Sequence, residues 1–187
     1  MPSIILASAS PRRKQLLTWS EIEFEVFTNH KSESYSNSID TKDVPAYLSL
    51  QKALAVQEVK KDKIILAADT IVLMQNKILG KPINQDDAYQ MLSLLSNNTH
   101  QVITGVSILH HEKQVTFSEL TEVEFAKLSD EQIMHYIEKY KPYDKAGSYA
   151  IQEWIGLIAI KSIKGCFYNV MGLPMQRVYH TLQTQFY

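Results

Sequence analysis

The chain has 187 residues and a formal net charge of -1, with 19 basic and 20 acidic side chains. That balance argues against broad electrostatic binding of nucleic acid or an anionic membrane, although it allows a small basic pocket. The single cysteine, Cys166, excludes an internal disulfide and a cysteine-rich zinc site. The N-terminus has no basic segment before its apolar run, and no apolar run approaches the length of a membrane span. We therefore expect a single cytoplasmic domain over residues 1–187.

Short apolar runs alternate with helical spacing through the first part of the chain. An apolar run that ends in turn residues predicts a buried strand. A serine followed by proline predicts a helix start, because serine caps helices and proline fits their first turn. The expected elements are a strand over 4–7, a helix over 11–19 capped by Ser10, a strand over 24–27, a polar surface or active-site loop over 29–41, and a helix over 44–60.

The rest of the chain mixes longer strand patterns with capped helices. The expected elements are a strand over 64–68 that stops at Asp69, a hairpin of 71–74 with 77–79, a helix from the Asn84 cap to Leu95, antiparallel strands over 101–110 and 114–126, a helix capped by Ser129 that ends before Pro142, strands over 149–152 and 155–163, and a closing helix over 174–184. Strands and helices in this order predict an α/β or α+β domain with a mixed sheet.

The first candidate for chemistry is residues 8–13, Ser-Ala-Ser-Pro-Arg-Arg. A strand that runs through a serine turn into a helix presents backbone N–H groups and the positive end of the helix dipole, which favour phosphate. Ser8 and Ser10 lie in that turn, and Arg12 and Arg13 add planar charged donors that can bind phosphate through two hydrogen bonds. The alternative is an ordinary capped helix with solvated arginines.

The second candidate is Asp69 with Thr70, directly after a predicted buried strand. Ligands gather at the carboxyl ends of strands in open α/β sheets, and a carboxylate there can hold a divalent cation or accept a proton from water. The alternative is a turn aspartate that caps the next segment. Lys81 follows the predicted hairpin, where it either neutralises a phosphate or is a solvated surface charge.

Other polar residues are less informative when taken singly. Glu33 lies in the polar loop, Lys52 borders the apolar face of a helix as snorkelling lysines do, and a lone His100 is more often structural than catalytic. Residues 144–152 place an acid, a base, a glycine and an amide in one turn. The amide of Gln152 can both donate and accept, so it could read the edge of a nucleobase, or it could be a polar residue at a hairpin edge.

These motifs are more informative as an ordered series along the chain than they are singly. They are residues 8–13, Glu33, Lys52 with Ala53, 68–72 (Ala-Asp-Thr-Ile-Val), 79–82 (Leu-Gly-Lys-Pro), 100–106 (His-Gln-Val-Ile-Thr-Gly-Val), 144–152 (Asp-Lys-Ala-Gly-Ser-Tyr-Ala-Ile-Gln) and 169–174 (Asn-Val-Met-Gly-Leu-Pro). The ordered series resembles the Maf family of nucleotide pyrophosphatases and spans nearly the whole chain.

The resemblance implies an α/β fold similar to inosine triphosphate pyrophosphatase, with a mixed central sheet flanked by helices and two lobes separated by a cleft. It implies hydrolysis of a nucleoside triphosphate between its α and β phosphates, with a divalent metal, Mg²⁺ or Mn²⁺. A homodimer is also expected by resemblance, whereas nucleic acid and membrane are not expected as partners.

The resemblance also carries roles for individual residues. Asp69 matches the catalytic acid, proposed to accept a proton from water, and Glu33 matches a metal ligand beside it. Arg12, Thr70 and Gln152 match positions tied to substrate choice. The phosphate-binding set is Ser8, Ser10, Arg13, Lys52 and Lys81.

Residues 144–152 resemble the branch of the family that acts on dTTP and UTP. The sibling branch, which prefers 7-methylated GTP, usually carries a glutamate in a different sequence context where Gln152 stands here. A glutamine amide can pair with both O4 and N3–H of uracil or thymine. One departure is the segment 97–100, which lacks a glycine common before His100 and so changes a turn. The alternatives are a pyrophosphatase for modified nucleotides and a regulator without turnover, since the family is linked to septum formation and cell-division arrest.

Overall fold

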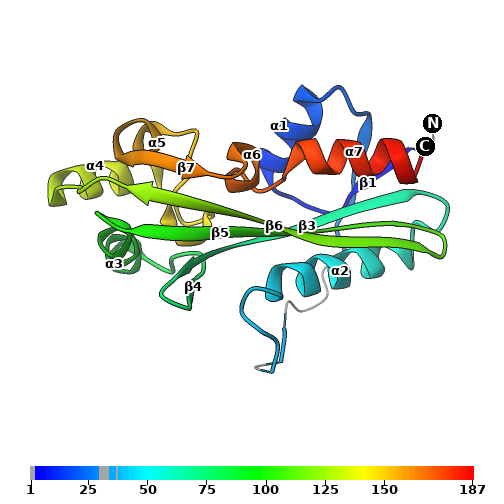
Figure 1. The fold of residues 1–187 in the computed structure, drawn as a ribbon, viewed down its shortest axis with the longest axis horizontal. Coiled ribbons are helices and arrows are strands. Elements are labelled where there is room, and N and C mark those ends of the chain that lie inside the picture. The colour runs from blue at the N-terminus through cyan, green and yellow to red at the C-terminus, as the bar shows by residue number, and fades with distance from the viewer. Residues whose placement is uncertain (1–2, 30–33, 37) are drawn as a thin grey trace. The chain divides into compact units, whose positions relative to one another are not determined.

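The computed structural model describes residues 3–29, 34–36 and 38–187 (Figure 1). Its elements are β1 (Ile4–Leu6), α1 (Pro11–Trp19), β2 (Phe24–Val26), α2 (Val44–Gln57), β3 (Ile64–Met74), β4 (Lys77–Leu79), α3 (Gln85–Leu95), β5 (Thr99–His110), β6 (Lys113–Phe125), α4 (Asp130–Tyr140), the 3-10 helix η1 (Ala146–Ser148), α5 (Trp154–Ala159), β7 (Ile160–Lys164), α6 (Phe167–Val170) and α7 (Met175–Gln185).

The strands form a seven-stranded sheet in the order β2-β1-β3-β5-β6-β7, with β4 paired to β3. β1 pairs in parallel with both β2 and β3, with Leu6 opposite Leu66 in the latter. β3 pairs antiparallel with β4, and β6 with β7. The sheet is therefore mixed and flanked by helices, which confirms the α/β fold expected from the sequence.

The chain divides into two compact units. Unit 1 consists of Met1–Thr70, Thr104–Glu119 and Gly172–Tyr187, and unit 2 of Ile71–Ile103 and Leu120–Met171. The strands β3, β5 and β6 contribute residues to both. The division agrees with the two lobes expected by resemblance.

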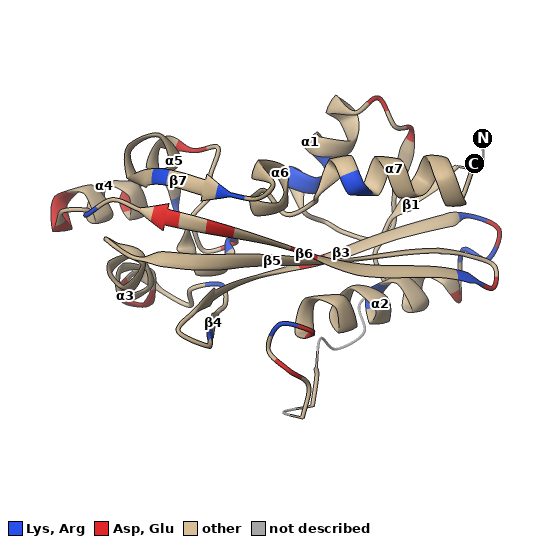
Figure 2. Ribbon diagram, in the orientation of Figure 1, with Lys and Arg blue, Asp and Glu red and all other residues tan. Residues whose placement is uncertain are grey.

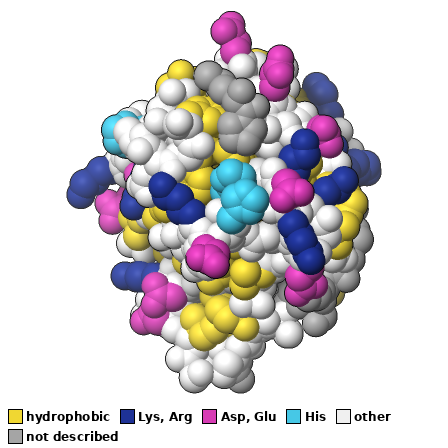
Figure 3. All heavy atoms as spheres, turned by 90° about the vertical axis from the view of Figure 1, so that its right-hand side faces the viewer, with side chains coloured by type: hydrophobic (Ala, Val, Ile, Leu, Met, Phe, Trp, Pro, Cys, Tyr) yellow, Lys and Arg dark blue, Asp and Glu magenta, His cyan; other side chains and the backbone are white. Residues whose placement is uncertain are grey.

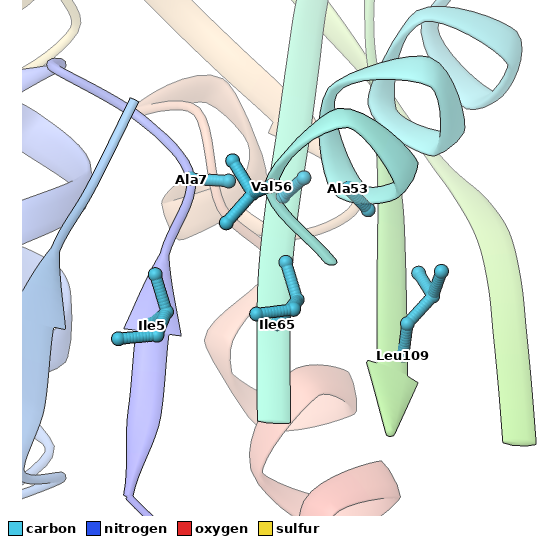
Figure 4. Packing of buried hydrophobic residues seen from close by; sticks show 7 residues of the cluster. Ile5, Ala7, Ala53, Val56, Ile65 and Leu109 are labelled. Carbon is cyan, nitrogen blue, oxygen red and sulfur yellow. The ribbon is translucent and has the colours of Figure 1, made fainter. Parts of the chain in front are cut away.

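In unit 1, α2 covers one face of the strands, and α1 and α7 lie on the other (Figure 1). Side chains alternate between the faces of a strand, so Ile65 and Ala67 of β3 point to the same face. Both pack with Val56 of α2 and Leu109 of β5 in one buried apolar cluster (Figure 4). Complete burial of an aliphatic side chain of this size contributes about 1.5–3 kcal/mol, so the cluster fixes α2 on the sheet.

A glycine sets how closely α2 approaches the sheet. A Cβ atom added to Gly105 of β5 would lie 2.1 Å from the carbonyl carbon of Pro45, at the start of α2. Backbone atoms cannot yield by that amount, so only glycine allows this contact. Gly105 therefore determines where the whole of α2, including Lys52, is placed.

Unit 2 has its own apolar contacts, with Ile71 and Leu73 of β3 packed against Ile103 of β5. At its exposed edge, acidic residues of β6 face basic residues of β7 (Figure 2). The clearest pair joins Glu124 to Lys161 at 2.6 Å. Exposed pairs of this kind contribute little to stability, at most about 1 kcal/mol. Figure 3 shows one face of the molecule on which basic and acidic side chains are interspersed.

Most element predictions are confirmed, including the helix caps. The hydroxyl of Ser10 accepts from the Arg13 amide, the side chain of Asn84 accepts from the Asp87 amide, and Ser129 forms a capping box with its helix. None of the described helices is long and apolar enough to cross a membrane.

Two strand predictions are wrong. The strand that begins at Ile64 does not stop at Asp69 but continues to Met74, because its second half gains β4 as a partner. The apolar, strand-like segments 149–152 and 155–163 are largely a turn followed by helix α5, and the strand β7 begins at Ile160. At Gly156 an added Cβ would lie 1.8 Å from the Ile151 carbonyl oxygen, so helix and turn meet through a glycine that strand propensity does not take into account.

Candidate active site

The turn before α1 is held by its own serines. The Ser10 amide donates to the Ser8 hydroxyl at 3.2 Å, and the Arg13 amide donates to the Ser10 hydroxyl at 3.5 Å. These two amides are therefore used within the turn. Any attraction of the turn for phosphate then depends on the arginine guanidinium groups more than on these two N–H groups.

The guanidinium group of Arg13 is fixed by three neutral oxygen atoms. Its Nε donates to the Gly172 carbonyl at 2.8 Å, one terminal nitrogen to the Ser8 hydroxyl at 3.1 Å, and the other to the Thr70 hydroxyl at 3.0 Å. A guanidinium has five N–H donors in one plane, so three bonds define its orientation completely. These three contacts hold the guanidinium of Arg13 beside Thr70 of β3.

Two further residues of this cluster were given no role by the sequence, although both lie in the quoted motifs. Thr104 is fully buried, and its hydroxyl lies 2.9 Å from that of Thr70. Gly172 has φ +110, in the left-handed region that glycine adopts without strain, and this directs its carbonyl towards Arg13. The available signal was a glycine within a quoted motif that had no assigned chemistry. We call Ser8, Arg13, Thr70, Thr104 and Gly172 the arginine cluster.

Asp69 belongs to a second group of contacts. Its Oδ1 lies 2.5 Å from Nζ of Lys52 on α2, and the two side chains are 14% and 23% exposed. Asp69 lies on the α2 face of β3, whereas its neighbour Thr70 contacts Arg13 from the opposite face, as strand alternation requires. The structure therefore brings Lys52 to Asp69 as an ion pair, and brings Ser8 and Thr70 to Arg13 in the arginine cluster. The two groups are joined through two successive residues of β3.

The fit to a divalent metal depends on Asp69. Among the described residues, no three His, Cys, Asp or Glu side chains converge as metal ligands, and Glu33 lies outside the described residues. A single carboxylate suits Mg²⁺ or Mn²⁺, since Mg²⁺ commonly takes one or two carboxylates and completes its shell with water and substrate phosphates. The donor chemistry of Asp69 therefore fits a metal that arrives with a nucleotide.

In unit 2, Lys81 and Gln152 are both exposed. The segment 144–152 approaches the end of β4 through Gly147, whose amide donates to the Gly80 carbonyl at 3.0 Å. Gly147 has φ +65, and an added Cβ would lie 2.9 Å from the side chain of Val72. Glycine therefore lets this segment pass directly beside the strand end that carries Lys81. Arg12, the remaining predicted residue, is half-buried in the first turn of α1.

His100 has a structural place in unit 2. Its Nε2 lies 2.7 Å from the Tyr149 hydroxyl, and its ring meets those of Tyr149 and Phe125 edge to face. Burial lowers the pKa of the His100 imidazole to about 4, and burial likewise raises the pKa of the Tyr149 hydroxyl. At neutral pH the pair is therefore uncharged, and it fastens segment 144–152 to the start of β5.

Comparison with known proteins identifies the family. The family model Maf, described as Maf-like protein, matches residues 3–185. The chain belongs to the Maf family. Its curated relatives include proteins named dTTP/UTP pyrophosphatase from Parabacteroides distasonis, Phocaeicola vulgatus and Cytophaga hutchinsonii. Their identities are 50%, 51% and 49%, over 96%, 96% and 98% of this chain and 94%, 94% and 84% of the relatives.

Solved structures give a more distant likeness. The Ham1 protein of Staphylococcus aureus matches with a TM-score of 0.47 at 14% identity, over 66% of this chain and 72% of that one. A HAM1 protein from Coxiella burnetii matches with a TM-score of 0.48 at 15% identity, over 68% and 75%. The assignment to the Maf family depends on the family model and the curated relatives.

Proposed function

We propose that this Maf-family chain is a nucleoside triphosphate pyrophosphatase that hydrolyses dTTP and UTP to the monophosphate and pyrophosphate. One observation carries the proposal. The neighbouring residues Asp69 and Thr70 of β3 connect the Asp69–Lys52 ion pair to the oriented guanidinium of Arg13. Hydrolysis of a phosphoanhydride is favoured by cations that stabilise the phosphate charge and by a carboxylate that accepts a proton, and here the two lie side by side. The curated relatives named dTTP/UTP pyrophosphatase, which are 50% and 51% identical to this chain, support the same proposal.

The phosphate chain is the most strongly charged part of the substrate, with roughly four negative charges near neutral pH that the site must offset. In this proposal the guanidinium of Arg13, oriented by Ser8, Thr70 and Gly172, contributes its positive charge to phosphate binding, and Ser8 and Ser10 shape the turn around it. Lys52 and Lys81 add point charges. The same cations stabilise the charge that develops on the leaving pyrophosphate.

Asp69 is the group that we assign to the attacking water. Its carboxylate accepts one proton while the water oxygen bonds to the α-phosphorus, the bond from that phosphorus to the bridging oxygen breaks, and pyrophosphate leaves. The ammonium of Lys52, at 2.5 Å, holds the carboxylate in place. We propose that Asp69 and Glu33 hold a divalent cation, Mg²⁺ or Mn²⁺, which when bound polarises the phosphoryl oxygens.

Choice of base is assigned to Gln152, with Arg12 and Thr70. The Gln152 side chain is exposed, so its amide can donate to O4 and accept from N3–H of uracil or thymine. Cytosine has an amine and a bare ring nitrogen at these positions, which reverses both hydrogen bonds. A site built for one pattern rejects the other strongly, since a mismatch leaves polar groups unpaired.

The test is pyrophosphate release from a panel of nucleotides: dTTP, UTP, CTP, dATP, GTP and 7-methyl-GTP, each with and without Mg²⁺ or Mn²⁺. We expect dTTP and UTP to be the best substrates and release to require the metal. If 7-methyl-GTP ranks first, the chain is a pyrophosphatase for modified nucleotides. If nucleotides bind without turnover, it is a regulator. We also propose that the hydrolysis clears non-standard nucleotides. A cytoplasmic location, a homodimer and the absence of a nucleic-acid partner stay predictions.

A further inference from the structure

The segment that carries Gln152 is a tight turn held at both ends by one buried hydroxyl group. Tyr136, on α4, is completely buried. Its hydroxyl accepts from the Ala150 amide at 3.2 Å and donates to the Glu153 carboxylate. Ala150 and Glu153 flank Gln152, so a single phenol fixes the turn on either side of the exposed amide.

The turn is also closed by its own backbone and by α5. The Glu153 amide donates to the Ala150 carbonyl at 3.1 Å, and the Gly156 amide donates to the Glu153 carbonyl at 2.9 Å. Gly156 lacks the Cβ atom that would collide with the Ile151 carbonyl. These contacts restrict the turn, but they all lie within segment 150–156, so they do not define where it sits in unit 2.

Charge keeps the Glu153 end of the turn in place. Lys145 is buried, and its Nζ lies 3.5 Å from Glu153 and 2.7 Å from Asp144. The Glu153 carboxylate, whose side chain is 24% exposed, thus accepts from the Tyr136 hydroxyl and pairs with the Lys145 ammonium. A hydrogen bond to a charged acceptor is roughly twice as strong as one between neutral groups, so the Tyr136 contact is well suited to hold the turn.

We propose that Tyr136 is a positioning residue for base selection, which acts on the nucleotide through the turn that carries Gln152. This inference rests on the proposed function, because it takes Gln152 to be the residue that reads the base. An amide on an exposed turn discriminates between bases only if its backbone is held still, since a mobile amide can rotate to suit either pattern. Tyr136 supplies that restraint from the core.

The test compares Tyr136→Phe with Tyr140→Phe. Both changes remove one phenolic oxygen from α4, and the two rings stack on one another at 4.9 Å. We expect Tyr136→Phe to raise KM for UTP about tenfold and leave kcat within about twofold, because base binding is shared by ground state and transition state. The UTP-to-CTP ratio in kcat/KM falls by about the same factor. Tyr140→Phe leaves the ratio unchanged.

A second measurement does not depend on turnover. Hydrogen exchange of peptides that cover residues 150–153 reports the Ala150 and Glu153 amides directly. We expect exchange to accelerate about tenfold in Tyr136→Phe and to stay at the original rate in Tyr140→Phe. If the unaltered protein releases no pyrophosphate from UTP or dTTP, the proposed function fails, and this exchange experiment still decides whether Tyr136 holds the turn.

Glu153 gives a variant that leaves the core intact. Glu153→Ala removes the acceptor from a partly exposed position and is expected to lower the UTP-to-CTP ratio as Tyr136→Phe does, whereas Glu153→Gln keeps an acceptor and retains most of the ratio. These two variants decide the matter if Tyr136→Phe does not fold. An unchanged ratio in a folded Tyr136→Phe or Glu153→Ala protein, or unchanged exchange over 150–153, overturns the proposal.

Discussion

Arg13 in unit 1 and Gln152 in unit 2 reach their positions by different means. The guanidinium of Arg13 itself donates to Ser8, Thr70 and Gly172. Gln152 is exposed, and its place is set by the backbone on either side of it, held by the buried side chains of unit 2. In unit 1 Arg13 is oriented by contacts of its own guanidinium, whereas in unit 2 Gln152 is positioned by residues that have no proposed chemical role.

The difference predicts two kinds of variant. Changes to Asp69 and to the phosphate-binding residues of unit 1 should reduce turnover of every nucleotide, because all of them share the phosphate chain. Changes to the support in unit 2 should alter which nucleotide is preferred, or the stability of the fold, while the phosphate chemistry continues. The predictions below are arranged from the largest expected effect to the smallest.

The largest effect is expected at Asp69. Asp69→Asn keeps the shape of the side chain but removes the charge that pairs with Lys52 and accepts the proton. We expect kcat to fall by about a thousandfold for UTP and dTTP alike, within the range for loss of a general base. The measurement is pyrophosphate release, with the exposed Asp86→Asn on α3 as control. Residual turnover above a tenth of the original would show that Asp69 is not the base.

Gly105 tests whether the position of α2 matters to unit 1. Gly105→Ala places a Cβ atom against the Pro45 backbone, so α2 and Lys52 must move. We expect a loss of about 3 kcal/mol in the free energy of unfolding, at the upper end for overpacking. Chemical denaturation measures it. Gly80→Ala is the matched control, since a Cβ there meets nothing within 4 Å and should change stability by less than about 0.5 kcal/mol. Equal effects of both changes would refute the packing argument.

His100 links the stability of unit 2 to pH. Its pKa is lowered by burial to about 4, so between pH 6.5 and 4 the unfolded chain binds a proton that the folded chain does not. Stability then falls as pH drops through that window and is fully retained above it, with a total contribution of about 3 kcal/mol. We expect His100→Gln to flatten this part of the melting-temperature profile. An unchanged slope would contradict the assignment of this pH dependence to His100.

The smallest effect is expected at Thr104, whose hydroxyl contacts that of Thr70 and which has no proposed role in substrate binding. Thr104→Val removes the hydroxyl 2.9 Å from that of Thr70 and keeps the volume. We expect kcat/KM to fall about fivefold, equivalent to about 1 kcal/mol, for all nucleotides. Thr104→Ser should restore it. The control is Ser107→Ala, which removes a buried hydroxyl of the same strand that bonds Ser49. If Ser107→Ala lowered kcat/KM by a similar factor, the Thr104 effect would reflect general packing rather than its contact with Thr70.

Much of the fold follows from local signals in the sequence. The caps at Ser10, Asn84 and Ser129 and the apolar periods between them place the helices, because capping and amphipathic spacing are properties of a few neighbouring residues. The continuation of β3 past Asp69 was missed, since it depends on pairing with β4 rather than on local composition. The segment after Tyr149 is a turn and a helix rather than a strand, because Gly156 lets α5 begin directly against the Ile151 carbonyl, which strand propensity does not take into account.

The same distinction applies to the proposed site. Ser8, Arg13 and Thr70 could be proposed from motifs, and the structure places them in contact. Thr104 and Tyr136 could not, because a buried hydroxyl has no signature until its partner is known. Charged site residues can be proposed from the sequence, whereas the residues that orient them are identified only from the fold.

The central claim is that phosphate binding and base selection are separable, and one paired measurement tests it most directly. The measurement is kcat/KM for UTP and CTP in Lys52→Gln and in Gln152→Glu. Lys52→Gln should lower both values by the same factor, whereas Gln152→Glu, whose carboxylate cannot donate to O4, should lower the UTP-to-CTP ratio at least about tenfold. An unchanged ratio in Gln152→Glu, or a changed ratio in Lys52→Gln, would contradict the account.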